Sequence, residues 1–460
     1  MELGDRALPV TRAQLDIWLA HEAGGSSAEW QLGLIVKIEG TIEHDALEWA
    51  VRRVLQEAEP ARATFFEVDG QVFQRAVDYP VVEVAFYDLS RSADPDREAR
   101  ETASTIQRTP MPLSGALFRF AIFQTRLDEF HLFACCHHIV MDGSGLALMC
   151  HRIASVYSAI VSGAPVPPAY FGSLQDLVDC ESEYEASGDY LEDQAYWTAN
   201  LPEEGGSSHR LSHAAGERDP YRSAAPARLD PVVLRRVQQL CDAWNVPRSS
   251  VITAACALLV RGFCAEGTEV VLDFPVSRRV LPELKTLPAM VAGVVPLVLR
   301  IAPDSAVAGF CEYVDTRIRE ALQHQRFPVR ALERKAHPRG PRELADRVVV
   351  DFLPSAFTVP FGGVEASASL ISGLAGGFGL IFTGTGDELL LSTLGAAQPF
   401  SNFAVTELAQ RLERVLVAMS GDPGRRLSSI DVLEGDERAW LVRVGNWGVL
   451  AGSVGVSVSI

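Results

Sequence analysis

The spacing of apolar residues along this chain predicts strands and helices in alternation. Residues 31–38 alternate as a half-buried strand does, and residues 42–58 carry apolar side chains at helical spacing. Two apolar runs, 63–68 and 71–74, meet across Asp69-Gly70, a pair typical of a hairpin turn. The mixture of the two periods indicates an α/β fold.

The second half of the chain repeats this mixture. Helical spacing is found near residues 234–244, at 250–262 and again around 408–416. Residues 270–276 and 351–354 have the composition of strands, and residues 380–382 and 389–391 form a predicted hairpin around Gly386-Asp387. The polar stretch 201–225 is predicted to be a loop. A chain of 460 residues exceeds the usual size of one domain, so we expect two lobes with a boundary near residue 175.

Reactive side chains cluster at one place in this pattern. An apolar run, 130–136, leads into His137-His138-Ile139-Val140-Met141-Asp142-Gly143, and the small pair Ser144-Gly145 opens a helix-like run. Successive side chains of a strand point to opposite faces, so His137 and His138 cannot both serve one active site. We expect one histidine to work and the other to pack, and the alternation does not decide which.

Composition excludes several classes of function. The formal net charge of −18 argues against a general nucleic-acid or anionic-membrane surface, because both require clustered Lys and Arg. No apolar run is long enough for a membrane span, and the N-terminus lacks the pattern of a signal peptide, so we expect a soluble, cytoplasmic protein. The eight cysteines form no disulfide framework, and the absence of zinc-ligand spacings predicts no metal.

The His-His-x-x-x-Asp-Gly motif resembles the signature of the condensation domains of nonribosomal peptide synthetases, which belong to the chloramphenicol acetyltransferase-like superfamily. Softer resemblances follow in the family's order. They include a capping box that opens the chain's first helix, a crossing helix, a sheet-bridging segment and a short His-Gln motif: Thr11-x-Ala13-Gln14-x-x-x-Trp18-Leu19, Tyr170 to Trp197, Met290 to Leu297, and His324-Gln325. We expect Leu15, Trp18 and Leu19 to share one face of the first helix.

The chain also departs from the family's pattern. Arg52, Arg62 and Phe65 resemble a degraded form of the second family motif. The bridging segment lacks the usual Asn, and Arg326 replaces a common Asp after His324-Gln325.

The resemblance implies a fold and a division of the chain. The fold is α/β, with two chloramphenicol acetyltransferase-like lobes in a V shape and a tunnel between them. Residues 1–175 form the N-terminal lobe with the motif, and residues 176–435 form the C-terminal lobe with bridging segments. Residues 436–460 are a linker-like tail of the kind that leads toward an adenylation domain. No such domain follows, as expected of an excised or separately encoded domain.

The resemblance also implies roles for the motif residues. His138 matches the catalytic position, and the Gly143 amide would face a developing oxyanion. Asp142 would form a salt bridge with an arginine of the second lobe, with Arg279 preferred and Arg278 as the alternative. His137 would support the turn, while Ser144 and His324 are possible tunnel residues.

The implied reaction joins two carrier-bound substrates. The amine of an acceptor aminoacyl thioester attacks the thioester of a donor acyl or peptidyl group, and both substrates ride on phosphopantetheine arms of carrier domains. No cofactor is bound directly, and neither nucleic acid nor a membrane takes part. His137 disfavours a cyclisation domain, and the small Ser144-Gly145-Leu146 segment resembles domains that accept aryl or fatty acyl starters.

Two other functions remain open at this point. A free-standing acyltransferase that moves an acyl group from a thioester to a small alcohol or amine shares the motif. A catalytically silent recruiting domain shares the fold.

Overall fold

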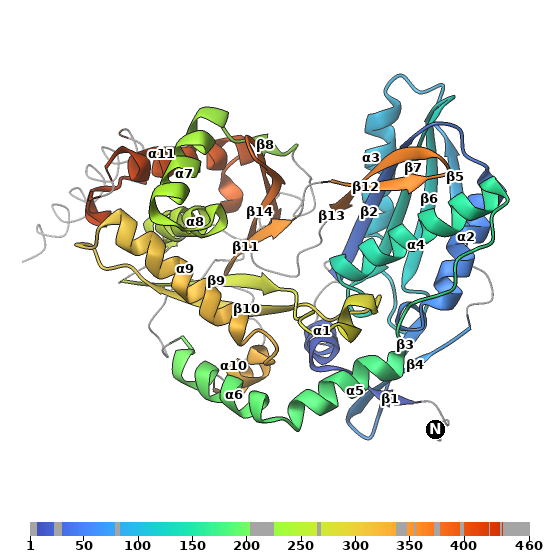
Figure 1. Ribbon diagram of the computed structural model, residues 1–460, viewed down its shortest axis with the longest axis horizontal. Coiled ribbons are helices and arrows are strands. Elements are labelled where there is room, and N and C mark those ends of the chain that lie inside the picture. The colour runs from blue at the N-terminus through green and yellow to red at the C-terminus, as the bar shows by residue number, and fades with distance from the viewer. Residues whose placement is uncertain are drawn as a thin grey trace, which may run out of the picture.

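The computed structural model describes residues 7–22, 30–78, 83–202, 225–264, 268–336, 347–353, 356–371, 378–395, 400–422, 424–432 and 435. The expected tail 436–460 lies outside these residues, as does most of the predicted polar loop, from 203 to 224. Figure 1 shows two lobes that are joined along the lower edge of the view and stand apart above it.

The first lobe is built on a six-stranded sheet. Its strand order is β12-β13-β2-β7-β6-β5, and its bounds are β2 (Gln31–Glu39), β5 (Val84–Asp88), β6 (Phe118–Arg126), β7 (Glu129–His137), β12 (Phe357–Phe361) and β13 (Val364–Ile371). The helices of this lobe are α2 (His44–Glu57), α3 (Pro95–Arg108) and α4 (Gly143–Ser162). A small sheet of β1 (Leu8–Pro9), β4 (Gln71–Ala76) and β3 (Ala63–Val68) completes it, with the predicted hairpin between β3 and β4.

The second lobe repeats this architecture with another six-stranded sheet. The strand order is β10-β9-β11-β14-β15-β8, with bounds β8 (Ala227–Arg228), β9 (Glu269–Val276), β10 (Gly293–Arg300), β11 (Val348–Leu353), β14 (Phe378–Thr385) and β15 (Glu388–Gly395). Its helices are α7 (Pro231–Trp244), α8 (Arg248–Cys264), α9 (Val307–Gln323), α10 (Val329–Ala336) and α11 (Val405–Gly421). The predicted hairpin around Gly386-Asp387 joins β14 to β15.

Strands β12 and β13 connect the two lobes in an unexpected way. They follow β11 in the chain, yet β13 pairs antiparallel with β2 and places Ile371 opposite Gly33. The segment that follows β11 of the second lobe therefore adds two strands, β12 and β13, to the sheet of the first lobe. Backbone hydrogen bonds across this pairing tie the lobes together.

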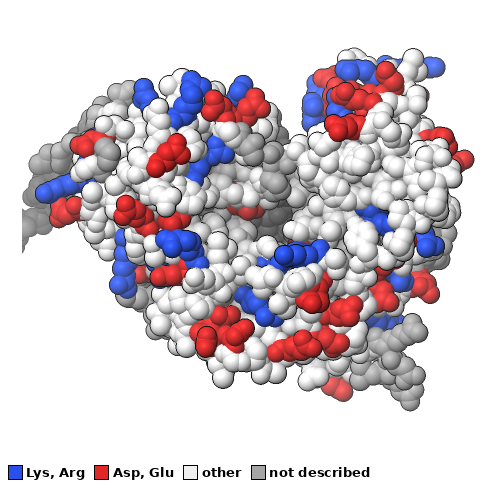
Figure 2. All heavy atoms as spheres, viewed as in Figure 1, with Lys and Arg blue, Asp and Glu red and all other residues white. Residues whose placement is uncertain are grey.

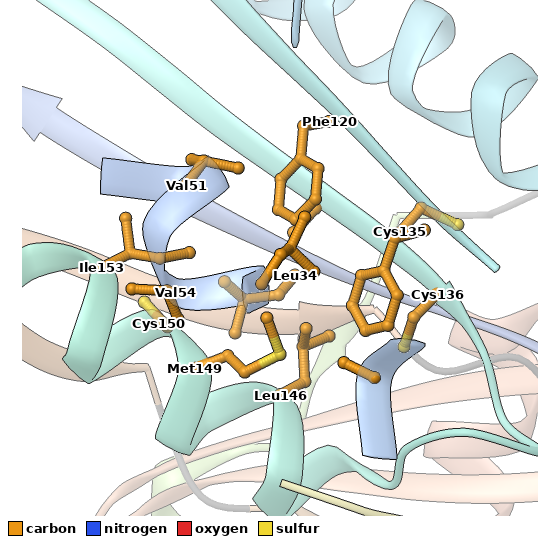
Figure 3. Close-up of a cluster of buried hydrophobic side chains, with 14 of the residues drawn as sticks. Leu34, Val51, Val54, Phe120, Cys135, Cys136, Leu146, Met149, Cys150 and Ile153 are labelled. Atoms are coloured by element: carbon orange, nitrogen blue, oxygen red, sulfur yellow. The ribbon is translucent and has the colours of Figure 1, made fainter. Parts of the chain in front are cut away.

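The core of the first lobe lies between its sheet and α4. Figure 3 shows side chains of α4 packed against side chains of β2, β6 and α2, among them Leu146, Met149, Ile153, Leu34 and Phe120. Within the described residues, α4 is also long and apolar enough to cross a membrane. Its burial against the sheet is that of the core helix of a globular domain.

The crossing segment below the lobes is two helices rather than the single predicted one. Helix α5 (Leu174–Glu185) starts at a capping box formed by Ser173 and Asp176, and α6 (Gly188–Asn200) starts at Ser187, whose hydroxyl accepts the Tyr190 N–H. The new cap at Ser187 breaks the helix because its side chain satisfies an amide that a continuous helix would bond to the backbone. Figure 1 shows α5 and α6 running along the lower edge between the lobes.

Helix α1 (Arg12–Glu22) corrects one expectation. Its buried residues are Ala13, Gln14 and Ile17, whereas Leu19 is exposed. Leu15, Trp18 and Leu19 therefore do not form the buried face of α1, where a polar side chain, Gln14, is buried with its amide hydrogen-bonded, although Trp18 packs partly against the core. On the other lobe, Arg334 of α10 reaches Asp16 of α1 at 2.6 Å, so α1 also contacts the second lobe.

Candidate active site

The motif lies in the centre of the first lobe, at the end of its most buried strand. All nine residues of β7 are buried, and β7 pairs with β2 on one side and β6 on the other. The strand ends at His137, the chain turns through residues 138–142, and α4 begins at Gly143. The turn closes with hydrogen bonds from the Val140 and Met141 amides to the carbonyls of His137 and His138. This is the predicted order of strand, turn and helix.

Asp142 is the centre of a buried hydrogen-bond network. Its Oδ1 accepts the Gly145 N–H at 2.8 Å, which caps α4, and also the Arg279 Nη2–H at 2.8 Å. Its Oδ2 accepts the amides of Val291 at 3.0 Å and Ala292 at 2.9 Å. A buried carboxylate is costly unless it is paired and its lone pairs are filled, and here both conditions are met. The network fixes the motif against the second lobe.

Arg279, rather than Arg278, is the partner of Asp142. Its Nη1 donates to the carbonyls of Leu284 and Leu287, and its Nη2 donates to the Ala289 carbonyl at 2.9 Å as well as to Asp142. Arg279 therefore holds the whole 284–289 segment against the motif.

Arg278 turns the other way. It has a left-handed φ of 54°, and its guanidinium donates to the carbonyls of Gln325 and Phe327. The two adjacent arginines thus serve different segments.

The two histidines differ in environment. His137 is fully buried, and its Nδ1 accepts the Ile139 N–H at 3.1 Å, so it supports the turn. Burial lowers the pKa of His137 to about 3, with His138 and His21 acting in the same direction. His138 is partly exposed. Burial also lowers the pKa of His138, against the raising effects of Asp142 and the Met141 backbone, so the ring is neutral at pH 7.

The sequence places Gln14 in a helix-start motif but does not predict its hydrogen bond to the histidine turn. Its Oε1 accepts the Thr11 N–H, as a capping box requires, and its Nε2 donates to the Ile139 carbonyl at 3.2 Å and to Gln74 at 2.8 Å. The sequence signal was the Gln itself at the third position of the helix. Helix α1 therefore positions the turn that carries His138.

Small residues open α4 where other segments approach closely. A Cβ at Gly145 would lie 2.8 Å from Met141 Cγ and 3.1 Å from the Ala289 N atom. A Cβ at Gly143 would lie 3.2 Å from Leu370 of β13. Ser144 between them is exposed. The first turn of α4 therefore has no room for a side chain at 145, is tight against Leu370 at 143, and presents the Ser144 side chain to solvent.

A small pocket adjoins this network at the joint between the lobes. Its volume is about 60 Å³, and its lining includes residues of α1, α5 and the second lobe, among them Arg12, Glu181, Arg278 and Val291. Val291 also donates to Asp142, so the pocket lies one residue away from the motif's anchor. Desolvation raises the pKa of Glu181 to about 7, with the Arg12 amide opposing it.

The remaining residues of the resembling motifs make contacts away from the histidine turn. His324 stacks on Tyr196 with ring centroids 4.1 Å apart, and its Nδ1 lies 2.7 Å from Asp193 Oδ1. Arg52 pairs with Glu48 on α2, and Arg62 binds the Val77 carbonyl and Asp78. Phe65 is in the core. His324 as a tunnel residue therefore stays a prediction.

Metal-ligand side chains come together at the edge of the first lobe. Ligand atoms of Asp96, Glu129 and His131 lie within 4.8 Å of one another. Lys37 approaches Glu129 at 2.9 Å, and Arg126 approaches it at 3.1 Å. These two cations already balance the two carboxylates, which disfavours a divalent ion there.

The chain resembles known proteins over most of its length. A sequence model of the family described as the condensation domain matches residues 5–353. The chain is 24% identical over 372 residues to the dimodular nonribosomal peptide synthase of Bacillus subtilis (strain 168), covering 80% of this chain and 15% of that protein. It is 26% identical over 494 residues to the isonitrile lipopeptide synthase of Mycobacterium tuberculosis (strain ATCC 25618 / H37Rv), covering 99% of this chain and 19% of that protein. The chain thus spans less than a fifth of the length of these relatives.

Solved structures match over almost the whole chain. The starter condensation domain of rhizomide synthetase, in complex with C8-CoA, is 26% identical, with a TM-score of 0.78 over 93% of this chain and 98% of that one. The first condensation domain of the calcium-dependent antibiotic synthetase, in complex with a substrate analogue, is also 26% identical, with a TM-score of 0.78 over 94% of this chain and 100% of that one. The chain belongs to the condensation domain family of nonribosomal peptide synthetases and has its chloramphenicol acetyltransferase-like fold.

Proposed function

We propose that this chain forms an amide bond between a carrier-bound donor acyl or peptidyl thioester and the amine of a carrier-bound aminoacyl acceptor. The observation that carries the proposal is the anchored turn, in which Asp142 bonds to Arg279 and to the Val291 and Ala292 amides while His138 remains partly exposed. Because these bonds form during folding, the turn that carries His138 needs no reorganisation when the substrates react.

His138 acts on the acceptor amine in this proposal. A neutral imidazole can accept the proton that the attacking amine loses, or it can hold the amine in line with the thioester carbonyl. Its lowered pKa keeps it neutral at the pH at which a useful fraction of an α-amine, with a pKa of about 8, is also neutral. As the amide C–N bond forms, the C–S bond of the donor thioester breaks, and the thiol of the donor arm leaves with the proton. The thioester is already activated, so the step needs no further energy source.

Gly143 supports the carbonyl side of the reaction. It is the first residue of α4, where backbone amides lack partners within the helix and the helix dipole favours negative charge. The Gly143 amide would stabilise the oxyanion, and the absence of a side chain keeps the approach open. His137 and Asp142 act through the shape of the turn.

The substrates reach this turn on phosphopantetheine arms of donor and acceptor carrier domains. Figure 2 shows the surface hollowed between the two lobes, and the pocket beside Val291 lies at their joint. We propose that these recesses are parts of one tunnel through which the arms enter. A starter acyl donor is favoured because one structural neighbour is a starter domain with a bound acyl-CoA and because Ser144-Gly145-Leu146 is small. In a larger synthetase, an adenylation domain would load the acceptor carrier.

The test is a transfer assay with intact-protein mass spectrometry. A carrier protein loaded with an octanoyl donor and a second carrier protein loaded with an amino acid are mixed with the wild-type chain, with His138→Ala or with His151→Ala. His151 is a matched control because it is an exposed histidine of α4. We expect the donor to move onto the acceptor carrier, and we expect His138→Ala to slow this by about 100-fold or more while His151→Ala does not.

Two results would redirect the proposal. Acylation of a small amine or alcohol, without transfer between carriers, would support a free-standing acyltransferase. Equal transfer by wild-type and His138→Ala protein would remove His138 from the mechanism.

A further inference from the structure

One face of the second-lobe sheet carries a carboxyl group, Asp351, that has no side-chain partner among the residues that the structure describes. The neighbours of Asp351 along β11, Val348 and Val350, belong to the second-lobe core, together with residues of α7, α8, α9 and α11. Because side chains alternate along a strand, Asp351 lies on the opposite face. Figure 1 shows α7, α8 and α11 on the side of this sheet turned away from the first lobe. Asp351 therefore belongs to the face turned toward the first lobe.

A second carboxylate on the same face is treated differently. Asp273 of β9 is the register partner of Val349, which places it on the same face as Asp351. Arg330 reaches Asp273 at 2.5 Å, and Arg347 reaches it at 3.5 Å. The protein thus supplies two arginines to Asp273, and Arg347 is held there by a further contact with Glu333 at 2.7 Å.

Asp351 has no such partner. Among the residues that the structure describes, no side chain forms a hydrogen bond or an ion pair with it, and the Phe352 backbone supplies its one favourable contact. The side chain is partly exposed, so it borders open space rather than lying inside the core. Desolvation by the surrounding protein nevertheless raises the pKa of Asp351 to about 6. An ionised carboxyl in such a place is unfavourable until a cation arrives.

Ideal strand geometry gives a rough distance between Asp351 and the segment that anchors the motif. The pairing of β11 with β9 ends at Val349 and Asp273, and continuing the two strands by two residues would set Asp351 level with Pro275, whose partner on β10 is Val294. Two strand spacings of about 4.8 Å and two residues of about 3.3 Å separate Asp351 from Ala292, a distance of roughly 12 Å. The Ala292 amide donates to Asp142. A substrate at His138 could extend over this distance.

We infer that Asp351 is a specificity-determining residue that binds a cationic group of the acceptor substrate. This rests on the proposed function, because the ligand is the aminoacyl acceptor of that reaction. The α-amine of the acceptor lies at His138 as the nucleophile, so the cation at Asp351 is an ammonium or guanidinium group on the acceptor side chain. Both have the same chemistry, a positive charge with N–H donors, and a carboxylate accepts from either.

The inference is tested by replacing the carboxylate with an amide of equal size. Wild-type, Asp351→Asn and Asp387→Asn proteins are supplied with an octanoyl donor and with N-acetylcysteamine thioesters of glycine, norleucine and lysine. Asp387 is the control because it is an exposed residue of the turn between β14 and β15 and pairs with Arg235. We expect Asp351→Asn to raise KM about tenfold to a hundredfold for the lysine thioester and to leave KM for the glycine and norleucine thioesters unchanged. An equal rise for all three acceptors would contradict the binding of a side-chain cation.

A binding measurement separates this inference from the proposed function. Calorimetry of lysinamide and norleucinamide with the same proteins requires no catalysis. We expect Asp351→Asn, but not Asp387→Asn, to weaken lysinamide binding by about tenfold or more. Transfer activity with unchanged KM and unchanged binding in Asp351→Asn would overturn the inference alone. Absence of transfer together with Asp351-dependent binding would overturn the proposed reaction and leave the cation site standing.

Discussion

Two carboxylates, the buried Asp142 and the partly exposed Asp351, differ in how completely the protein satisfies them. Asp142 accepts four hydrogen bonds, one of them from Arg279, and it lies where the two lobes meet. Asp351 lies on the free face of the second sheet with no side-chain partner among the described residues. The carboxylate of Asp142 has all its hydrogen-bond partners without substrate. The carboxylate of Asp351 lacks a side-chain partner among the described residues, as expected of a group that binds a ligand.

The largest effect is expected from Asp142→Asn. The change leaves the Arg279 guanidinium buried without its counter-charge, and removal of one partner of a buried ion pair costs about 3–5 kcal/mol of the free energy of unfolding. Urea unfolding at pH 7.5, followed by tryptophan fluorescence, measures this. The paired change Asp142→Leu with Arg279→Met is the control, because it removes both charges and should recover part of the loss. A single change that costs less than about 1 kcal/mol would contradict the described role of Asp142.

An intermediate effect is expected from Gly145→Ala, which tests the contact around Asp142 without touching a charge. The new Cβ would be 2.8 Å from Met141 and 3.1 Å from the Ala289 backbone, so the motif and the second-lobe segment must move apart. Such overpacking costs about 1–3 kcal/mol. Gly309→Ala is the control, since a Cβ there meets nothing within 4 Å and α9 gains helix propensity. Equal stability of the two variants in thermal unfolding would rule out the close approach.

The smallest effect is the pH dependence of stability contributed by Asp351. Its folded pKa is about 6, above the ordinary value of 3.8, so the folded state holds a proton that the unfolded state releases. Wild-type stability should therefore fall as the pH rises from about 4 to 6, and Asp351→Asn should lack this decrease.

The variant is expected to match the wild type at pH 3.5 and to be more stable at pH 8. The gain should be about 1–2 kcal/mol after allowance for partial exposure. Unfolding curves at both pH values measure the difference. A variant that is less stable than the wild type at pH 8 would mean that the carboxylate has a partner in the folded protein.

The sequence predicted the motif's local structure well because its signals are local. A short apolar strand, a turn and a helix follow directly from periodicity, and helix α4 ends at Ser162, before Gly163 in the left-handed conformation. The pairing of Asp142 with Arg279 came from the family resemblance, since 137 residues separate the two. The structure confirms that pairing and excludes Arg278.

Long-range features could not be predicted from one sequence. The buried face of α1 depends on Gln14, whose burial is explained by partners at positions 74 and 139. The crossing of β12 and β13 into the first-lobe sheet has no sequence signature, because the strands have the same pattern wherever they pair. Asp351 was visible as part of a late strand, but its lack of a partner is a property of the folded sheet.

The pairing of β13 with β2 also limits how such a chain can be recombined with others. An exchange of the amino-terminal half alone would place a foreign β2 beside the resident β13, with Gly33 to Ile38 needing to fit Ile371 to Ala366 in register. A chimera that moves residues 356–371 together with the first lobe would keep this seam intact. Gene fragments that end between the lobes would instead express a sheet with an open edge, which invites aggregation.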